Sequence, residues 1–389
     1  MRDLSRCVSH PAVSQEGFAS LAVPTYRAST IVYPDAESFL QRKSRGPDGY
    51  TYGLHGTPTT RTLEAQLTAL HGGVRTILVP SGQAAITTVL QTVLLPGDRV
   101  LIPDTVYSPV RGFCANFLAP RGIEHTVYDP LIGAGIAALI DERTRLIWVE
   151  SPGSGTMEVQ DLPAIVAAAR ARGVLVGCDN TWASPLLFKP LALGADFAME
   201  ALTKYVGGHS DLLLGSVSVA DLALHRRLKD TLRMTGVGIS PDEAALALRG
   251  LETMGVRIAH MGRVSTDLAT RLQGMPLVER VLHPALPSCP GHAFWQRDFA
   301  GASGVFSLLL APSAGARLAA AISGMRIFAI GASWGGTHSL IAPMAIAGDR
   351  SVRPWTHRGP LLRLSIGLED PEDLWEDLQR LFAALQHAP

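Results

Sequence analysis

One lysine occupies a setting that could make it chemically reactive. Lys204 follows an apolar stretch and precedes the glycine-rich segment Gly207-Gly208, so it belongs neither to an amphipathic helix nor to a run of charges. Thr203 beside it offers a hydroxyl, and the two glycines let backbone approach a ligand closely. A lysine removed from water has a lowered pKa and can act as a nucleophile and a base. Most loop lysines are simply exposed, so this interpretation requires a partner residue.

An aspartate upstream is a candidate for that partner. Asp179 directly follows the apolar run 174–178, and the carboxyl ends of parallel strands are where α/β folds bind ligands. The alternative is that Asp179 caps a helix or a turn. Pyridoxal 5'-phosphate (PLP) needs a lysine that binds its aldehyde covalently and a carboxylate that keeps its ring nitrogen protonated. Lys204 and Asp179 together therefore indicate PLP as the cofactor.

Two further segments could hold the rest of such a cofactor. Ser81, Gly82 and Gln83 follow an apolar run and open a helical pattern, so the backbone N–H groups of Gly82 and Gln83 could bind a phosphate. A simple turn is the alternative there. Tyr107 lies just beyond the next apolar run and could stack on the cofactor ring, although packing is the more common role of such a tyrosine.

Short apolar runs alternate with helical patterns around these residues, which predicts a mostly parallel sheet covered by helices on both faces. We assign residues 59–240 to this large α/β domain. Its first helix is expected to be capped by Thr59 or Thr60 and to end at Gly72. The predicted strands are 76–79, 99–102, 146–149, 174–178, 197–199 and 212–219, and the predicted helices are 83–94, 108–117, 162–172 and 221–234.

The two ends of the chain differ from this domain in composition and periodicity. Residues 1–58 contain several prolines and little periodicity, which predicts an extended arm with one short helix at 36–43. Because such an arm has no core of its own, we expect it to lie on a neighbouring subunit. Residues 241–389 predict a smaller α+β domain. It would contain helices 242–273, 314–323 and 371–386 and strands 279–282, 304–310 and 361–366.

The composition excludes several classes of function. The 389 residues include 34 Lys+Arg and 34 Asp+Glu, so nothing favours long-range attraction to nucleic acid or anionic lipid. No run of about 18 apolar residues predicts a membrane span, and the first residues lack the apolar core of a signal peptide. The four cysteines have no CxxC-like spacing. We expect a cytoplasmic protein without a metal site or disulfides.

Several motifs, in order along the chain, resemble the PLP-dependent enzymes of cysteine and methionine metabolism. They are segments 150–154, 178–182, 201–211, 333–336 and 361–370. Ser333-Trp334-Gly335-Gly336 is most similar to the bacterial cystathionine β-lyase branch, because γ-acting relatives usually carry leucine at the position of Trp334. The resemblance runs from about residue 20 to the end. It implies the type I PLP-dependent transferase fold, which is aspartate-aminotransferase-like.

The resemblance also implies a role for each matching residue. Lys204 would bind the cofactor and then take the substrate Cα proton, Asp179 would pair with the ring nitrogen, and Tyr107 would stack on the ring. Tyr52 would reach the phosphate and substrate of a neighbouring subunit, within a tetramer built from two dimers. The phosphate contacts would be Gly82, Gln83 and Thr203, and the substrate contacts would be Arg363, Ser154, Ser333 and Trp334.

The implied activity is carbon–sulfur β-elimination from L-cystathionine to homocysteine, pyruvate and ammonia. A γ-lyase, a γ-replacing transferase acting on O-acetylhomoserine or O-succinylhomoserine, a cysteine desulfhydrase and a non-catalytic PLP-binding protein are the alternatives. Three positions depart from the family pattern. Leu54 replaces an arginine that contacts the neighbour's phosphate, with His55 beside it as partial compensation; Ala201 replaces a serine, and His338 replaces a glutamate.

Overall fold

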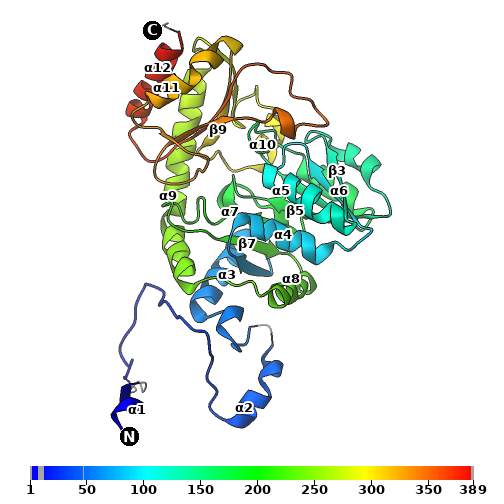
Figure 1. Ribbon diagram of the computed structural model, residues 1–389, viewed down its shortest axis with the longest axis vertical. Coiled ribbons are helices and arrows are strands. Elements are labelled where there is room, and N and C mark those ends of the chain that lie inside the picture. Colours follow the sequence, from blue (N-terminus) through cyan, green and yellow to red (C-terminus); the bar gives the residue numbers. More distant parts are fainter. Residues whose placement is uncertain (1, 8–12, 47, 387–389) are drawn as a thin grey trace.

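Two β-sheets organise the protein in the computed structural model, which describes residues 2–7, 13–46 and 48–386 (Figure 1). The larger sheet has seven strands in the order β1-β7-β6-β5-β4-β2-β3. Its pairs are parallel except that β7 runs antiparallel to both β1 and β6. The predicted α/β fold with a mostly parallel sheet is confirmed. The strands are β1 (Arg75–Val79), β2 (Arg99–Pro103), β3 (Glu124–Tyr128), β4 (Thr144–Glu150), β5 (Leu175–Asp179), β6 (Phe197–Glu200) and β7 (Gly215–Val219).

Apolar side chains on both faces of this sheet explain why helices cover both sides. On β4, Trp148 belongs to the cluster beneath α4, α5 and α8, whereas Ile147 and Val149 pack on the opposite face with α6. Successive side chains of a strand point to opposite faces, so a continuously apolar strand has to be covered twice. These helices are α4 (Gly82–Val93), α5 (Ser108–Phe113), α6 (Leu162–Arg170) and α8 (Leu222–Thr235).

Three local predictions for this domain need correction. Strand β3 was not predicted, because at the sheet edge only Tyr128 is fully buried and the segment lacks a continuous apolar run. Helix α3 (Pro58–His71) is capped by Thr57, not by Thr59 or Thr60, since Pro58 occupies its first turn and Thr57 accepts the Thr60 N–H. The predicted helix 108–117 divides after Phe113, and the turn Cys114–Leu118 is π-helical.

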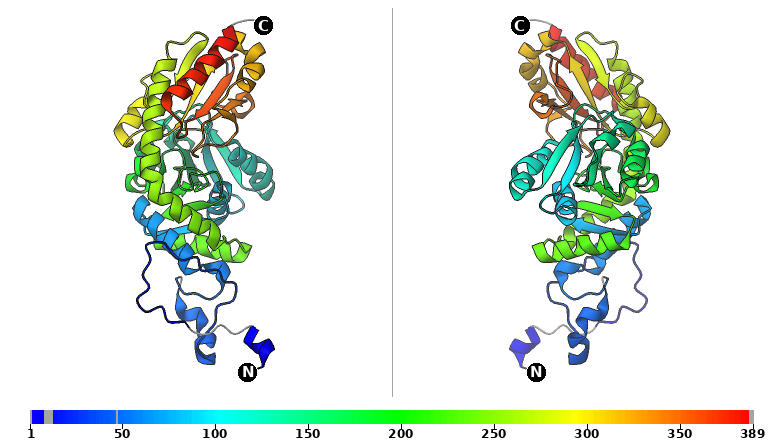
Figure 2. Two further views of the ribbon diagram at one scale, coloured as in Figure 1. Left: turned by 90° about the vertical axis from the view of Figure 1, so that its left-hand side faces the viewer. Right: turned by 90° about the vertical axis from the view of Figure 1, so that its right-hand side faces the viewer.

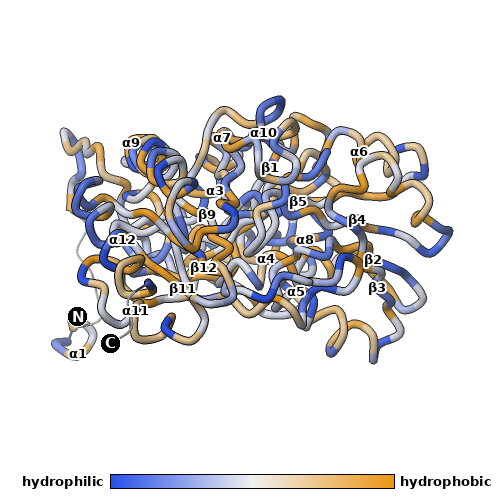
Figure 3. The backbone as a smooth tube through the Cα atoms, turned by 90° about the horizontal axis from the view of Figure 1, so that it is seen from above, coloured by the Kyte–Doolittle hydropathy of each residue, from blue (hydrophilic) through white to orange (hydrophobic). Residues whose placement is uncertain are grey.

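The smaller sheet has five strands in the order β10-β11-β12-β9-β8 and packs against the C-terminal helices. Figure 3, in which the backbone is coloured by the hydropathy of each residue, shows mainly hydrophobic residues along β9 and β12. Strands β10 and β11 and helix α10 were not predicted; β11 contains Pro343, and β10 is only two residues long and exposed. The elements are β8 (Val278–Leu282), α10 (His292–Asp298), β9 (Val305–Leu310), α11 (Leu318–Ser323), β10 (Ala329–Ile330), β11 (Leu340–Met344), β12 (Leu361–Ser365) and α12 (Pro371–Gln386).

One long helix joins the two halves. Helix α9 (Pro241–Leu272) has 32 residues, a length of about 48 Å, and runs along both sheets in the views of Figures 1 and 2. Its first half packs with Leu63 and Leu67 of α3, and its second half joins the core of the smaller sheet. The division at residue 240 stays a prediction, because this helix contributes to both cores.

The N-terminal segment lies against little of the rest of the chain. No described residue before Thr57 is buried, and Leu21, Val32 and Leu40 are largely exposed. Short helices α1 (Asp3–Cys7) and α2 (Ala36–Leu40) interrupt it, and residues 1, 8–12 and 47 of the predicted arm lie outside the described residues. Coverage of this arm by a second subunit stays a prediction. Within the described part of the chain, no helix has the length and apolarity to cross a membrane.

Candidate active site

A cavity of about 290 Å³ lies at the carboxyl ends of β4 and β5, which end at Glu150 and Asp179. Both halves of the chain contribute to its wall, since Trp334 and Arg363 come from the region of the smaller sheet. The structure therefore brings together residues that are up to 282 positions apart, from Ser81 to Arg363. The lining includes these predicted site residues: Gly82, Gln83, Tyr107, Ser154, Asp179, Thr203, Lys204, Trp334 and Arg363.

Lys204 lies in this cavity as a half-buried amine. Its Nζ donates a hydrogen bond of 2.7 Å to Ser333 Oγ and lies 5.2 Å from the centre of the Trp334 ring. Burial and, next in size, the Arg363 guanidinium lower the pKa of Lys204 to about 8, against the opposing effect of Asp179. A lysine in this environment is neutral far more often near pH 7 than one in water.

The turn that carries Ser333 and Trp334 fits closely over the backbone of Lys204. Gly335 has a φ of +82°, and a Cβ at this position would lie 3.1 Å from the carbonyl carbon of Lys204. Both the left-handed backbone and the close approach require glycine here. The turn therefore places Ser333 next to Lys204, and the resemblance had assigned both residues to one site.

Asp179 is fixed by a residue that the sequence analysis did not single out. Thr181 donates to Asp179 Oδ1 through its hydroxyl at 2.5 Å and its N–H at 2.9 Å. The Thr181 hydroxyl also accepts the Ala201 N–H at 3.0 Å, which links Asp179 to the turn that carries Lys204. Burial raises the pKa of Asp179, the two Thr181 bonds oppose that shift, and Glu200 adds to it. A buried carboxylate with one oxygen held in place is suited to a cationic partner at the other oxygen.

Glu150 is a second cavity carboxyl group that sequence reasoning missed. It pairs in register with Asp179 across β4 and β5, and its Oε2 accepts the Tyr107 N–H at 2.7 Å. Burial raises the pKa of Glu150, and the neighbouring Asp179 raises it further. Glu150 lies at the carboxyl end of an apolar strand. The same signal identified Asp179 and could have identified Glu150.

The start of α4 offers backbone donors to the cavity. Gly82 and Gln83 occupy its first turn, where N–H groups have no carbonyl partner within the helix, and Ser81 caps the N–H of Ala84. A Cβ on Gly82 would lie 2.6 Å from the Cβ of Ala201, so a side chain would not fit. Thr203 lines the same region, but its hydroxyl donates to the Leu214 carbonyl and accepts the Leu214 N–H.

Arg363 brings a cation to the cavity from β12. It is buried and donates to the carbonyl oxygen of Ala332, just before Ser333. Burial lowers its pKa, and Tyr107 opposes the shift. A guanidinium so placed can bind a planar carboxylate through two parallel hydrogen bonds.

Leu54, which departs from the family pattern, and its neighbours Tyr52 and His55 do not line this cavity. Tyr52 is 48% exposed and does not line the cavity of its own chain. Leu54 and His55 border a smaller hollow next to α8, where burial, and then the cations Arg233, Lys229 and Arg61, lower the pKa of His55. His338 is exposed, and its Nδ1 shares a hydrogen bond of 3.1 Å with the hydroxyl of its neighbour Thr337.

Comparison with known proteins identifies the family. The model of the Cys/Met metabolism PLP-dependent enzymes matches residues 6–383. The chain belongs to this family. The observed two-sheet architecture is the type I fold that its motifs implied, and PLP is its cofactor.

Proteins named for different reactions are similar to this chain. A protein of Rhizobium johnstonii provisionally named a cystathionine beta-lyase is 46% identical over 93% of this chain and 91% of its own. Cystathionine beta-lyase MetC of Escherichia coli is 39% identical over 92% of both chains. The L-alanine/L-glutamate racemase of Wolbachia pipientis is 38% identical over 94% and 93%. The crystal structure of cystathionine gamma synthase from Xanthomonas oryzae has a TM-score of 0.86, 30% identity and 95% coverage of both chains.

The cavity fits this cofactor. A half-buried amine with a lowered pKa, a fixed carboxylate and a helix N-terminus face one space of about 290 Å³. These groups match the aldehyde, ring nitrogen and phosphate of PLP in kind.

Proposed function

We propose that the protein is a carbon–sulfur β-lyase that cleaves L-cystathionine to homocysteine, pyruvate and ammonia. The observation that supports this most is the single cavity that joins Lys204, Asp179 and Arg363 beside the Trp334 turn. Relatives named for this activity at 39–46% identity over most of the chain favour the same conclusion.

In this proposal the residues divide the work of binding and orientation. Arg363 binds the substrate α-carboxylate bidentately, with Ser154 and Ser333 beside it. Asp179 holds a proton on the ring nitrogen of PLP, and Tyr107 stacks on the ring. The N–H groups of Gly82 and Gln83 hold the phosphate, with the Thr203 hydroxyl as an additional contact.

Lys204 moves the proton on which the reaction depends. Bound PLP supplies an aldehyde for the substrate amine and a ring that withdraws electrons from Cα. With PLP and substrate bound, Lys204 Nζ would remove the Cα proton, and its lowered pKa suits a base at neutral pH. The electron pair of the Cα–H bond then forms the Cα–Cβ double bond while homocysteine thiolate leaves Cβ. Water converts the resulting enamine to pyruvate and ammonia.

Tyr52 and the N-terminal arm enter this proposal through a second copy of the chain. Tyr52 is exposed on its own subunit, and the arm carries exposed apolar side chains without a core. We infer a cytoplasmic homotetramer made of two dimers, in which Tyr52 contacts the phosphate and substrate of the neighbouring site. Sedimentation of the holoenzyme tests this, and a fully active monomer contradicts it.

A turnover assay with L-cystathionine tests the proposed reaction. We expect pyruvate and homocysteine, each identified chromatographically, in equal amounts. Formation of 2-oxobutyrate and cysteine would instead identify a γ-lyase.

A second candidate reaction is amino-acid racemisation, which also begins with removal of the Cα proton. The racemase relative at 38% identity is the observation that favours it. Incubation with L-alanine, followed by chiral analysis, measures it directly. Formation of D-alanine at a kcat/KM above that for cystathionine would replace the β-lyase proposal.

A further inference from the structure

The candidate site is assembled from two halves of the molecule. Asp179 is the last residue of a strand of the larger sheet and Lys204 follows the next strand, whereas Arg363 lies on a strand of the smaller sheet. The distance between the substrate carboxylate and the reacting amine therefore depends on how firmly the halves are held together.

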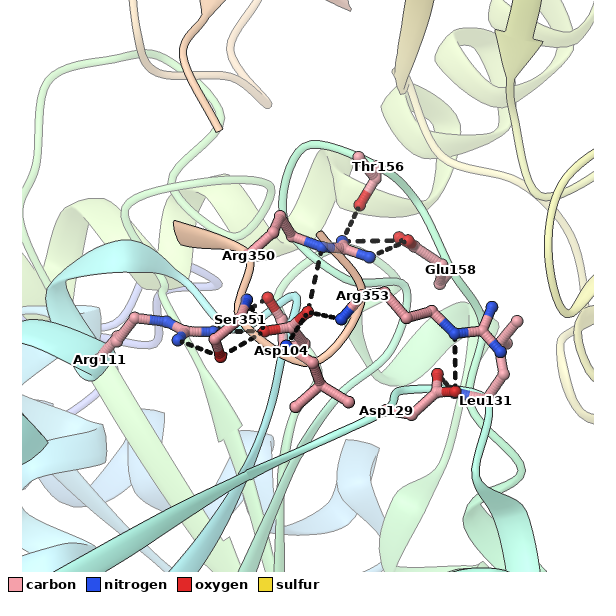
Figure 4. A network of polar contacts seen from close by, with 10 residues as sticks. Asp104, Arg111, Asp129, Leu131, Thr156, Glu158, Arg350, Ser351 and Arg353 are labelled. Atoms are coloured by element: carbon pink, nitrogen blue, oxygen red, sulfur yellow. Dashed lines mark hydrogen bonds and ion pairs between the residues drawn. The ribbon is translucent and has the colours of Figure 1, made fainter. Parts of the chain in front are cut away.

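A buried carboxylate lies where the two halves meet near the cavity. Asp104 directly follows β2, and its side chain is fully buried. Its Oδ1 accepts the Ser351 N–H at 2.8 Å, the Ser351 hydroxyl at 3.0 Å and Arg111 Nη2 at 3.0 Å (Figure 4). Its Oδ2 accepts the N–H groups of Val352 at 3.2 Å and Arg353 at 3.0 Å.

Residues 350–353, which we call the strap, are bound to the larger half at further points. Arg350 Nε forms an ion pair with Asp104 at 3.3 Å, and its other nitrogens donate to Thr156 at 3.0 Å and Glu158 at 3.1 Å. Arg353 Nε donates to Asp129 at 2.7 Å. Figure 4 shows these contacts converging on Asp104 and the loop around Thr156.

Both ends of this attachment continue into the cavity wall. Asp104 is three residues before Tyr107, and the carbonyl of its neighbour Thr105 accepts the Ser154 N–H at 2.9 Å. The strap lies within the connection from β11 to β12, the strand that carries Arg363. A single carboxylate thus joins the Tyr107 side of the cavity to the loop that leads into the Arg363 strand.

The charge of Asp104 is stabilised where it lies. Burial alone would raise its pKa, but the N–H groups of Arg353, Ser351 and Val352 and the Arg111 side chain more than offset this, so the pKa is lowered. Asparagine would replace one acceptor oxygen with an amide donor facing N–H groups that need an acceptor.

We propose that Asp104 is a positioning residue that ties the strap to the larger half and thereby sets the Arg363 side of the site against Lys204. This rests on the proposed role of Arg363 as the receptor for the substrate carboxylate. The observation that carries it is the set of five hydrogen bonds and the ion pair between fully buried Asp104 and residues 111 and 350–353.

The test compares Asp104→Asn with a matched control, Asp377→Asn, as holoenzymes. Asp377 is also fully buried and accepts the N–H groups of Arg326, Ile327 and Phe328, but all of these belong to the smaller half. The probe is glycine, which has a carboxylate and no leaving group, and its Kd is measured from the cofactor absorbance. We expect Asp104→Asn to raise the Kd of glycine and the KM of the turned-over substrate about tenfold, with kcat changed less than threefold.

Asp377→Asn is expected to lower the unfolding temperature while leaving the Kd of glycine within twofold of wild type. If Asp104→Asn does not fold, Ser351→Ala, which removes one hydroxyl that donates to Asp104, takes its place as the test variant. It should raise the Kd of glycine about threefold. An unchanged Kd of glycine in folded Asp104→Asn overturns the proposal. If Asp104→Asn does not fold, an unchanged Kd in Ser351→Ala overturns it. A rise of the Kd in Asp377→Asn equal to that in the test variant also overturns it. The glycine titration needs no elimination step, so its result is independent of whether wild type cleaves cystathionine.

Discussion

The lowered pKa of Lys204 predicts how fast the apoenzyme binds its cofactor as the pH changes. With a pKa of about 8, roughly 9% of Lys204 is neutral at pH 7, compared with roughly 0.03% for a lysine at its ordinary value of 10.5. Because only the neutral amine attacks an aldehyde, we expect Lys204 to react with PLP about 300 times faster at pH 7 than its ordinary pKa would allow.

The assay is the second-order rate constant for PLP binding to the apoenzyme, followed by absorbance between pH 6 and pH 10. Dividing each value by the rate constant for free Nα-acetyl-lysine removes the titration of PLP itself. This ratio should fall as the pH rises above about 8, because Lys204 is already roughly 90% neutral at pH 9 while the neutral fraction of the free amine still increases about tenfold per pH unit there.

Replacing Arg363 removes the guanidinium next to Lys204 and should change the pKa of Lys204. In Arg363→Leu the repulsion that disfavours the charged amine is lost, so the pKa of Lys204 should rise, although burial still holds it below 10.5. The rate profile of this variant should therefore shift to higher pH. A ratio that stays constant with pH in wild type, or an inflection that does not move in Arg363→Leu, would refute the account.

Three further predictions concern other groups. Asp179→Asn should lower kcat/KM at least about 100-fold, measured with cystathionine, because a neutral amide does not keep the PLP ring nitrogen protonated. Leu54→Arg should tighten PLP binding about tenfold, measured by equilibrium dialysis, because a charge-assisted bond to phosphate is restored in a neighbouring subunit. In the native protein only Cys7 should react rapidly with a thiol reagent, since it is exposed, whereas burial raises the pKa of the other thiols. These thiols are Cys114, Cys178 and Cys289.

Each of these has a contradicting result. Wild-type turnover in Asp179→Asn would exclude the ring-nitrogen role. If Leu54→Arg left the PLP affinity unchanged while Leu54→Met also did so, position 54 would have no contact with phosphate. Rapid reaction of more than one thiol before unfolding would show that the buried cysteines are accessible to the reagent.

Much of the fold could be predicted because its signals are local. The apolar runs that became β1, β2, β4, β5 and β6 are continuous, since each strand is covered on both faces. Edge strand β3 and the two-residue strand β10 lack that cover, so no such run marks them, and Pro343 within the apolar run of β11 argues against a strand there. The cap of α3 was predicted at Thr59 or Thr60, two or three residues too late, because the pair Thr57-Pro58 that begins the helix was not used.

The sequence by itself determined the chemical types of the site: a lysine after a strand, an aspartate at a strand end and a helix opening with glycine. Those assignments depend on residues adjacent along the chain. Tertiary structure alone decided which groups touch them, including Thr181 on Asp179, Ser333 on Lys204 and the Asp104 attachment. Asp104 and Ser351 are 247 positions apart, and their contact exists only because the parts of the chain that carry the two sheets are packed together. Periodicity reports which face of an element is buried, but the partner across that face is set by packing.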